Sequence, residues 1–153
     1  MKHIVFDCDG TLLDTSGYKY KLFPGIKELL IDLAREHMLY VWTARGRDST
    51  LRVLEELGVG NLFEAYYTMD DGPAKPNVAG ISSLVAGHNK DSVCMIGDTS
   101  NDIIGGKNFG VLTLGAIWNG QSSGPVLTDF GADFIVSHPS ECSTLIQQNL
   151  KAE

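Results

Sequence analysis

The sequence has few cysteines and no long apolar run, and both absences narrow the class of protein. Cys8, Cys94 and Cys142 are its cysteines, and no two of them have CxxC spacing. We therefore expect a reducing compartment, with neither a disulfide framework nor a structural zinc site. No stretch approaches the roughly 18 apolar residues that a membrane-spanning helix needs. Asp7 interrupts the apolar run at the N-terminus before that run is long enough to resemble a signal peptide. These features predict a soluble, cytoplasmic protein without a membrane partner.

Basic residues are also scarce relative to acidic ones. The 153 residues include 12 Lys and Arg against 19 Asp and Glu, which gives a net charge of −7. This balance argues against nucleic acid as a partner, because such binding depends on neutralising phosphates with basic side chains. A small phosphate ligand stays compatible, since a bound metal ion can reverse the local field. The length and the lack of a repeat or linker predict a single domain over residues 1–153.

Short apolar runs alternate with segments of helical periodicity. The strands are expected at residues 4–6, 39–42, 66–68, 93–96, 111–114 and 134–136, and the helices at 24–33, 51–57, 81–85, 102–108 and 141–150. This alternation predicts βαβ units in a Rossmann-like three-layer α/β/α fold, whose central, mostly parallel sheet has five to six strands. Residues 14–23 and 119–125 show the least regular pattern.

Polar side chains follow the predicted strands at the points where they end. In chain order they are Asp7, Asp9, Thr43, Arg45, Asp70, Asp71, Lys75, Asp98 and Asp102. In a parallel sheet these ends meet at one edge, where ligands bind. Clustered carboxylates raise one another's pKa and need a cation. Oxygen ligands without His or Cys favour Mg²⁺, which also takes substrate phosphate oxygens. The pattern therefore points to phosphoryl transfer.

Four of these segments resemble the motifs of the haloacid dehalogenase superfamily. The run Asp7–Asp14 (DCDGTLLD) is similar to the first motif, Thr43 to the second and Lys75-Pro76 to the third. Residues 97–102 (GDTSND) are similar to the fourth, and residues 105–110 extend it in the manner of phosphoglycolate-phosphatase-like members. The acid at Asp9 resembles the phosphatases of the superfamily and not its dehalogenases.

The resemblance implies a Mg²⁺-dependent phosphomonoester hydrolase. Asp7 would be the nucleophile that forms an aspartyl-phosphate, and Asp9 would be the general acid and base. Mg²⁺ would be held by Asp7, Asp98, the main-chain carbonyl of Asp9 and, directly or through water, Asp102. Thr43 and Lys75 would bind the transferring phosphoryl group and complete the catalytic set. The substrate-binding set would comprise Gly10, Thr43, Ala44, Arg45 and Lys75, with the N–H of Gly10 facing phosphate.

The resemblance also implies a core without a cap domain. Only residues 14–23 remain where relatives insert a cap, and the span from Thr43 to Lys75 holds one helix and one strand. Two alternatives stay open. One is a phosphatase for a small sugar or acid phosphate that is capped by a neighbouring subunit, hence a homo-oligomer. The other is a non-catalytic phosphoacceptor or regulatory module that is phosphorylated on Asp70 or Asp71.

Two further expectations concern segments beside these motifs. Cys8 should point away from the flanking acids and be buried, because side chains alternate along a strand. Residues 18–21, which alternate Tyr and Lys, form either a hairpin with one solvated face or a clamp on the substrate or another subunit.

Overall fold

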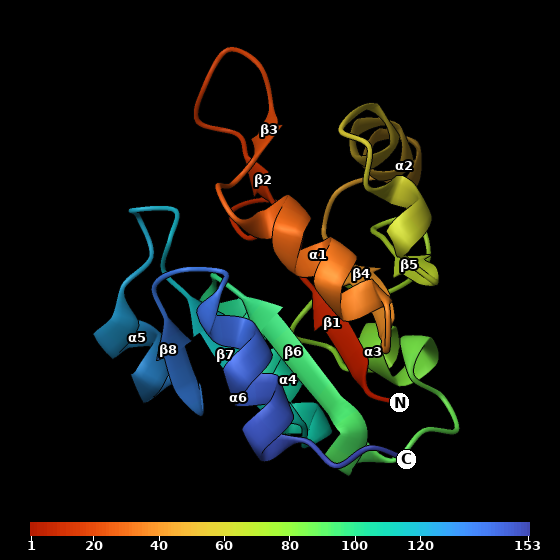
Figure 1. Cartoon of the computed structure of the whole chain (residues 1–153), viewed down its shortest axis with the longest axis vertical. Coiled ribbons are helices and arrows are strands. Elements are labelled where there is room, and N and C mark those ends of the chain that lie inside the picture. The colour runs from red at the N-terminus through yellow and green to blue at the C-terminus, as the bar shows by residue number, and fades with distance from the viewer.

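Six strands form one parallel sheet in the computed structural model, which describes all 153 residues. They are β1 (His3–Phe6), β4 (Met38–Trp42), β5 (Ala65–Tyr67), β6 (Val93–Gly97), β7 (Leu112–Ala116) and β8 (Phe134–Val136). Their order is β5-β4-β1-β6-β7-β8, and every neighbouring pair is parallel. The predicted Rossmann-like fold is therefore confirmed (Figure 1).

Helices cover both faces of this sheet (Figure 1). They are α1 (Ile26–Ala34), α2 (Arg47–Glu56), α3 (Ala79–Leu84), α4 (Ser100–Phe109), α5 (Gly124–Asp129) and α6 (Glu141–Asn149), with short 3-10 helices η1 (Gly60–Leu62) and η2 (Lys90–Ser92). Ile4 and Phe6 of β1 pack in a cluster with apolar residues of α1, α2 and α6. Val5 joins a second cluster with Ile81 of α3. Because both faces are covered, β1 is a continuous apolar run rather than an alternating one.

The strand order reverses direction at β1, which lies between β4 and β6. Strand β4 and its neighbour β5 extend the sheet to one side, and β6, β7 and β8 extend it to the other. Such a reversal leaves a crevice at the carboxyl ends of the strands, since the connecting helices leave in opposite directions. The residues that follow β1, β4 and β6 therefore meet in one place.

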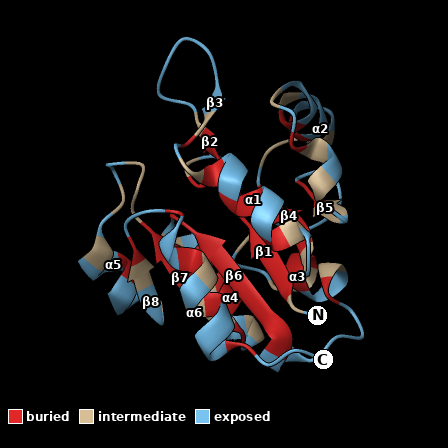
Figure 2. Ribbon diagram, viewed as in Figure 1, coloured by how far each residue is buried: buried red, intermediate tan, exposed pale blue.

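A small hairpin stands where a cap domain would be inserted. Strands β2 (Leu13–Asp14) and β3 (Lys21–Leu22) pair antiparallel. The loop between them, residues 15–20, is exposed throughout (Figure 2). Between β4 and Lys75 the chain forms only α2, η1 and β5 before its loop. The chain therefore contains no cap domain at either position, as predicted.

Several element boundaries differ from those predicted. Helix α2 begins at Arg47 rather than near 51, and α4 spans Ser100–Phe109 rather than 102–108. The stretch 119–125, predicted to be irregular, contains the start of α5. Ser123 caps this helix by accepting the N–H of Val126. A helix this short shows too little periodicity to be recognised from its apolar residues.

The three cysteines all lie inside the protein. Cys8, Cys94 and Cys142 are free and buried. Cys8 packs with Ile4 and Phe6 on the face opposite Val5, as strand alternation predicted. None of the helices has the length and apolar character that crossing a membrane would require.

Candidate active site

A cavity of about 440 Å³ lies at the carboxyl ends of the central strands. It is lined by Asp7, Asp9, Thr43, Ala44, Arg45, Lys75, Thr99, Asn101 and Asp102. Gly10 and Asp98 line an adjoining hollow that also reaches Asp9. The structure thus brings together every residue that the sequence proposed for catalysis, substrate binding or metal binding.

Asp7 is the first polar residue after β1, and only 6% of its surface is exposed. Its Oδ1 accepts a hydrogen bond from Lys75 Nζ at 2.7 Å. Its Oδ2 lies 3.4 Å from the hydroxyl of Thr11. Burial raises the pKa of Asp7 well above its usual value, and the nearby carboxylate of Asp102 adds to the rise while Lys75 opposes it. A carboxylate in this setting needs positive charge beside it to stay ionised.

Asp98 and Asp102 supply two more carboxylates from the end of β6 and the start of α4. One oxygen from each of Asp7, Asp98 and Asp102 lies within 4.8 Å of the other two. Burial raises the pKa of Asp98, and the charge of Asp102 contributes to the rise. Asp102 also caps α4, because its Oδ2 accepts the N–H groups of Asp98 at 2.9 Å and Thr99 at 3.0 Å.

Lys75 is the cation inside this acidic cluster. Its Nζ lies 2.7 Å from Asp102 Oδ1, and it donates to the carbonyl oxygen of Trp42 at 2.8 Å. Burial lowers the pKa of Lys75, but the carboxylates of Asp7 and Asp102 outweigh this effect and raise it above its usual value. Lys75 is therefore a fixed positive charge at the position where phosphoryl oxygens would approach Asp7.

The donor set of this cluster fits a divalent cation such as Mg²⁺. Three carboxylates face a single lysine, so negative charge is in excess. Lys75, 2.7 Å away, is the one protein group that contacts the buried Oδ1 atom of Asp102, so this oxygen can also accept a cation. All nearby donors are oxygen atoms, which Mg²⁺ prefers, and no imidazole or thiolate joins them.

Asp9 is oriented differently from Asp7. Its side chain is 49% exposed, and both of its oxygens accept hydrogen bonds from Arg45, at 2.9 Å and 3.1 Å. Thr43, at the end of β4, is buried, and its hydroxyl oxygen accepts the N–H of Arg45 at 3.1 Å. The side chains of Asp9 and Arg45 thus meet on the open side of the cavity, above the buried cluster.

Gly10 makes the sharp turn that the sequence predicted, with a φ of +84°. The prediction for its main-chain N–H was wrong, because that N–H donates to the carbonyl of Leu13 at 2.8 Å and does not face a phosphate site. A Cβ at this position would lie 2.2 Å from Oδ2 of Asp98. Glycine is needed here for the turn and because Asp98 approaches the backbone so closely.

Sequence reasoning missed two residues that hold Asp98. The hydroxyl of Thr11, which is fully buried, donates to Asp98 Oδ1 at 3.0 Å. The side-chain amide of Asn119 donates to Asp98 Oδ2 at 2.9 Å and to the carbonyl of Gly10 at 3.2 Å. Thr11 lies within the first motif, which was a usable signal. Asn119 follows β7 in a stretch with no local pattern. Its position after the end of a strand was the one feature of the sequence that could have identified it as a site residue.

Asp70 and Asp71 do not join the acidic cluster. Asp70 Oδ2 accepts the N–H of Arg47 at 2.8 Å, and Asp71 Oδ2 accepts from the guanidinium of Arg47 at 2.6 Å. Asp71 Oδ2 also accepts the N–H of Thr68 at 2.7 Å. Although partial burial acts to raise the pKa of Asp71, the hydrogen bonds from Arg47 and Thr68 lower it overall. These acids hold the start of α2 against the loop after β5.

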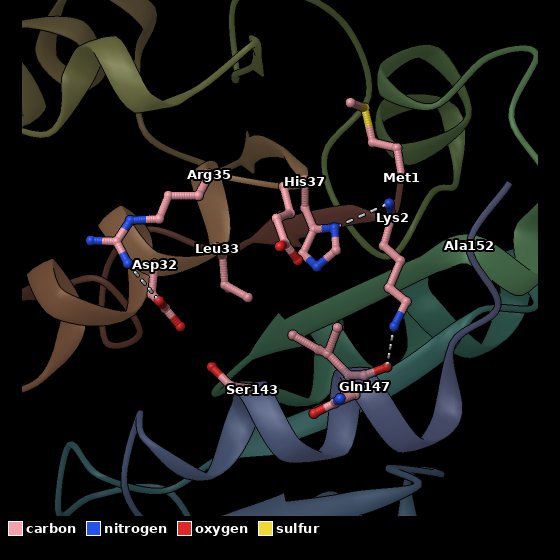
Figure 3. Close-up of a pocket in the computed structure, with 11 residues that line it drawn as sticks. Met1, Lys2, Asp32, Leu33, Arg35, His37, Ser143, Gln147 and Ala152 are labelled. Atoms are coloured by element: carbon pink, nitrogen blue, oxygen red, sulfur yellow. Dashed lines mark hydrogen bonds and ion pairs between the residues drawn. The ribbon is translucent and has the colours of Figure 1, made fainter.

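A groove of about 590 Å³ lies at the opposite end of the sheet, between α1 and α6. Figure 3 shows Asp32 and Arg35 on one side of it, Gln147 on the other, and Lys2 reaching toward the backbone of α6. Lys2 donates to the carbonyl of Ile146 at 3.4 Å, and Arg35 pairs with Asp32 at 3.3 Å. This groove contains no cluster of carboxylates comparable to the one around Asp7.

The fold and the cavity define a parallel α/β protein with an acid-and-lysine site at its topological switch point. Residues 17–116 match the family model described as haloacid dehalogenase-like hydrolase. This match covers more than half of the sequence, and the chain belongs to that family. The sequence resemblance to the superfamily is thereby confirmed.

Two curated relatives illustrate the similarity in sequence. A phosphoglycolate phosphatase from Caulobacter vibrioides is 33% identical over 132 residues, which cover 81% of this chain and 55% of the relative. Pyrophosphatase PpaX from Listeria monocytogenes is 29% identical over 130 residues, which cover 82% of this chain and 59% of the relative. The chain thus spans little more than half the length of these relatives.

Solved structures share the fold at lower sequence identity. A hydrolase from Pseudomonas syringae superposes with a TM-score of 0.84 at 16% identity, covering 99% of this chain and 100% of that one. A haloacid dehalogenase-like hydrolase from Streptococcus pneumoniae superposes with a TM-score of 0.82 at 20% identity, covering 96% of this chain and 99% of that one. These likenesses establish the same three-layer architecture.

Proposed function

We propose that this chain is a phosphatase, a Mg²⁺-dependent phosphomonoester hydrolase, and that residues 1–153 act as one catalytic unit in the cytoplasm. The observation that carries the proposal is the 2.7 Å contact between Lys75 Nζ and Asp7 Oδ1 beside the carboxylates of Asp98 and Asp102. The names of the two curated relatives, both of which describe phosphate-releasing enzymes, also support it.

In the first step Asp7 acts as the nucleophile. One of its carboxylate oxygens forms a bond to phosphorus, the bond from phosphorus to the ester oxygen breaks, and Asp9 transfers its proton to that ester oxygen. Lys75 orients Asp7 by its hydrogen bond and offsets the negative charge of the phosphoryl oxygens, to which the hydroxyl of Thr43 donates a hydrogen bond. The alcohol leaves, and an aspartyl-phosphate on Asp7 remains.

In the second step water hydrolyses the aspartyl-phosphate. Asp9, now a carboxylate, takes a proton from the water as its oxygen bonds to phosphorus. The bond between phosphorus and the Asp7 oxygen breaks, which releases phosphate and restores the carboxylate. Mg²⁺ would be held by Asp7, Asp98, the Asp9 carbonyl and Asp102, and when bound it supplies positive charge against the carboxylates and the phosphoryl oxygens.

The direct test is hydrolysis of p-nitrophenyl phosphate by the purified chain in the presence of Mg²⁺. We expect steady turnover that EDTA abolishes and excess Mg²⁺ restores. Asp7→Asn should lower kcat by at least about 10³-fold, since the amide is no nucleophile toward phosphorus. Asp71→Asn, which changes an acid outside the cluster, is the matched control and should stay active. Undiminished activity of Asp7→Asn would remove the mechanism.

Measuring turnover together with the site of phosphorylation separates this proposal from the alternative of a non-catalytic phosphoacceptor. A stable acyl phosphate on Asp70 or Asp71 without turnover would favour that alternative. Both acids are hydrogen-bonded to Arg47 and neither belongs to the carboxylate cluster around Asp7, which argues against that alternative.

A phosphatase covered by a second copy of the chain is a further candidate. The observation that favours it is the exposure of large apolar side chains on the hairpin and the loop beside Arg45, namely Tyr18, Tyr20 and Met69. Light scattering of the purified chain tests it. A monomer at micromolar concentration that is fully active would exclude a covering subunit.

A further inference from the structure

The carboxylate of Asp9 is fully engaged by one side chain. Arg45 Nε donates to Asp9 Oδ1 at 2.9 Å, and Arg45 Nη2 donates to Asp9 Oδ2 at 3.1 Å. Both oxygens of the proposed general acid are therefore occupied by a two-pronged guanidinium contact. Neither oxygen is placed to give a proton to an ester oxygen while this contact lasts.

Arg45 is itself held on its other sides. Its Nη1 donates to the hydroxyl of Ser49 on α2 at 2.6 Å. The guanidinium carbon lies 5.1 Å from the centre of the Tyr20 ring, which comes from the hairpin. Only 14% of the Arg45 side chain is exposed. The guanidinium is thus fixed at the mouth of the cavity, next to Asp9 and Ala44.

Release of Asp9 requires another partner for Arg45. A largely buried guanidinium that loses its carboxylate keeps its charge and loses two charge-assisted hydrogen bonds, which is unfavourable. A neutral leaving group does not replace that carboxylate. A leaving group with its own carboxylate or phosphate does, because the guanidinium fork matches the paired oxygens of either group.

We infer that Arg45 is a leaving-group receptor that holds Asp9 until an anionic leaving group takes its place. The substrate class that follows is phosphate esters or anhydrides whose leaving group carries a second anion close to the scissile oxygen. This inference rests on the proposed function and deepens it. The anion displaces Asp9 from Arg45, and the freed Asp9 carboxylate takes a proton from solvent water, which it then gives to the ester oxygen in the first step already described. No additional reactant is needed.

A pair of substrates that differ in one charge tests the inference. Phosphoglycolate carries a carboxylate on its leaving group, and phosphoglycolamide carries a neutral carboxamide of similar shape. We expect the wild-type chain to have a kcat/KM at least about ten-fold higher for phosphoglycolate, the value of one charge-assisted contact. Pyrophosphate provides a phosphate leaving group, and its rate relative to phosphoglycolate tells which anion the site prefers.

Variants at Arg45 separate recognition from folding. Arg45→Met should lose the preference, because its kcat/KM for phosphoglycolate should fall by about ten-fold relative to its kcat/KM for the amide. Arg45→Lys should keep part of the preference for phosphoglycolate, because the positive charge remains although the two-pronged guanidinium contact is lost. Arg52→Met removes a positive charge from an exposed position of the same region and should behave as wild type.

Hydrolysis of p-nitrophenyl phosphate distinguishes the possible failures. Nitrophenolate departs without a proton, so the first step on this substrate, measured as a burst of nitrophenolate, needs Asp7 and Lys75 but no proton from Asp9. Wild-type hydrolysis of p-nitrophenyl phosphate with equal rates on the glycolate and the amide would overturn the inference alone. An equal fall of Arg45→Met on all substrates would also overturn it, since that result indicates a structural role. No hydrolysis of any substrate by the wild type would overturn the proposed function.

Discussion

Gly10 shows how one backbone position sets the geometry of the carboxylate cluster. Its φ of +84° is strained for residues with a Cβ. The absence of a side chain also lets Asp98 pack directly against the turn, where Thr11 and Asn119 hold its two oxygens. The same glycine therefore permits the turn and leaves the space that Asp98 occupies.

Gly10→Ala should lose more stability than its backbone conformation alone explains. The left-handed conformation costs about 1–2 kcal/mol, and the new Cβ would push against Asp98. The matched control is Gly87→Ala, with a φ of +82° and nothing within 4 Å of the new Cβ. In urea unfolding we expect Gly10→Ala to lose at least about 1 kcal/mol more than the control, and to gain less stability from added Mg²⁺. Equal losses would show that Asp98 is not constrained by this contact.

The residues of the site differ in how far sequence alone reveals them. Asp7, Asp9 and Gly10 lie in one motif, and Lys75 precedes a proline in a loop, so their grouping follows from strand-end reasoning. Asn119 has no such motif. It reaches Asp98 because β7 pairs with β6, a tertiary fact that no local pattern around residue 119 encodes.

At the scale of elements, helix α4 is tied to the site by its first turn. Thr99 and Asp102 form a capping box, in which the Thr99 hydroxyl accepts the N–H of Asp102 and the Asp102 carboxylate accepts the N–H of Thr99. The same carboxylate lies 2.7 Å from Lys75 through its other oxygen. Asp102 therefore joins the start of the helix to the cation of the site.

Thr99→Ala should destabilise the protein by about 1 kcal/mol, the usual contribution of a capping hydroxyl. Thr99→Ser keeps the hydroxyl and is the matched variant, for which we expect little change. Chemical unfolding followed by circular dichroism measures both. If Thr99→Ser loses as much stability as Thr99→Ala, the methyl group and not the cap is what matters at this position.

The elements that sequence predicted well are those with long apolar patterns. Continuous apolar runs marked the buried strands, and the spacing of Ile26, Leu29, Leu30 and Leu33 marked α1, all four of which are buried. The start of α2 was placed too late because its first turn is stabilised from outside. Asp70, far along the chain, accepts the N–H of Arg47 at 2.8 Å. Such a tertiary cap leaves no trace in the local sequence.

At the scale of the whole molecule, the end of the sheet opposite the cavity has its own polar network. His3, the first residue of β1, is buried, and its ring stacks on His88 with 3.8 Å between ring centres. Its Nδ1 is 2.9 Å from the hydroxyl of Tyr40, and its Nε2 is 2.9 Å from Glu153 Oε1. Burial lowers the pKa of His3, while the hydrogen bond to Glu153 opposes this effect.

This network predicts a specific contribution to stability against pH. A histidine of the unfolded chain has a pKa of about 6.5, whereas the pKa of His3 in the folded protein is lower. As the pH falls from about 7.5 to about 5.5, the unfolded chain binds this proton more readily, so the contribution of His3 to the free energy of unfolding decreases. Asp7 and Asp98, whose pKa values are raised by burial, act in the opposite direction.

Because these effects oppose one another in the wild type, the contribution of His3 to the free energy of unfolding is measured by comparing the wild type with a variant that lacks this histidine. His3→Gln removes the titrating group and leaves both acids in place. We expect it to be less stable at about pH 7.5, since it loses the stacked ring and its hydrogen bonds. When the pH is lowered from about 7.5 to about 5.5, we also expect the free energy of unfolding of this variant to fall by less than that of the wild type. His138→Gln, at an exposed position, should follow the wild-type curve. Parallel curves for His3→Gln and the wild type would mean that the buried ring does not titrate differently on folding.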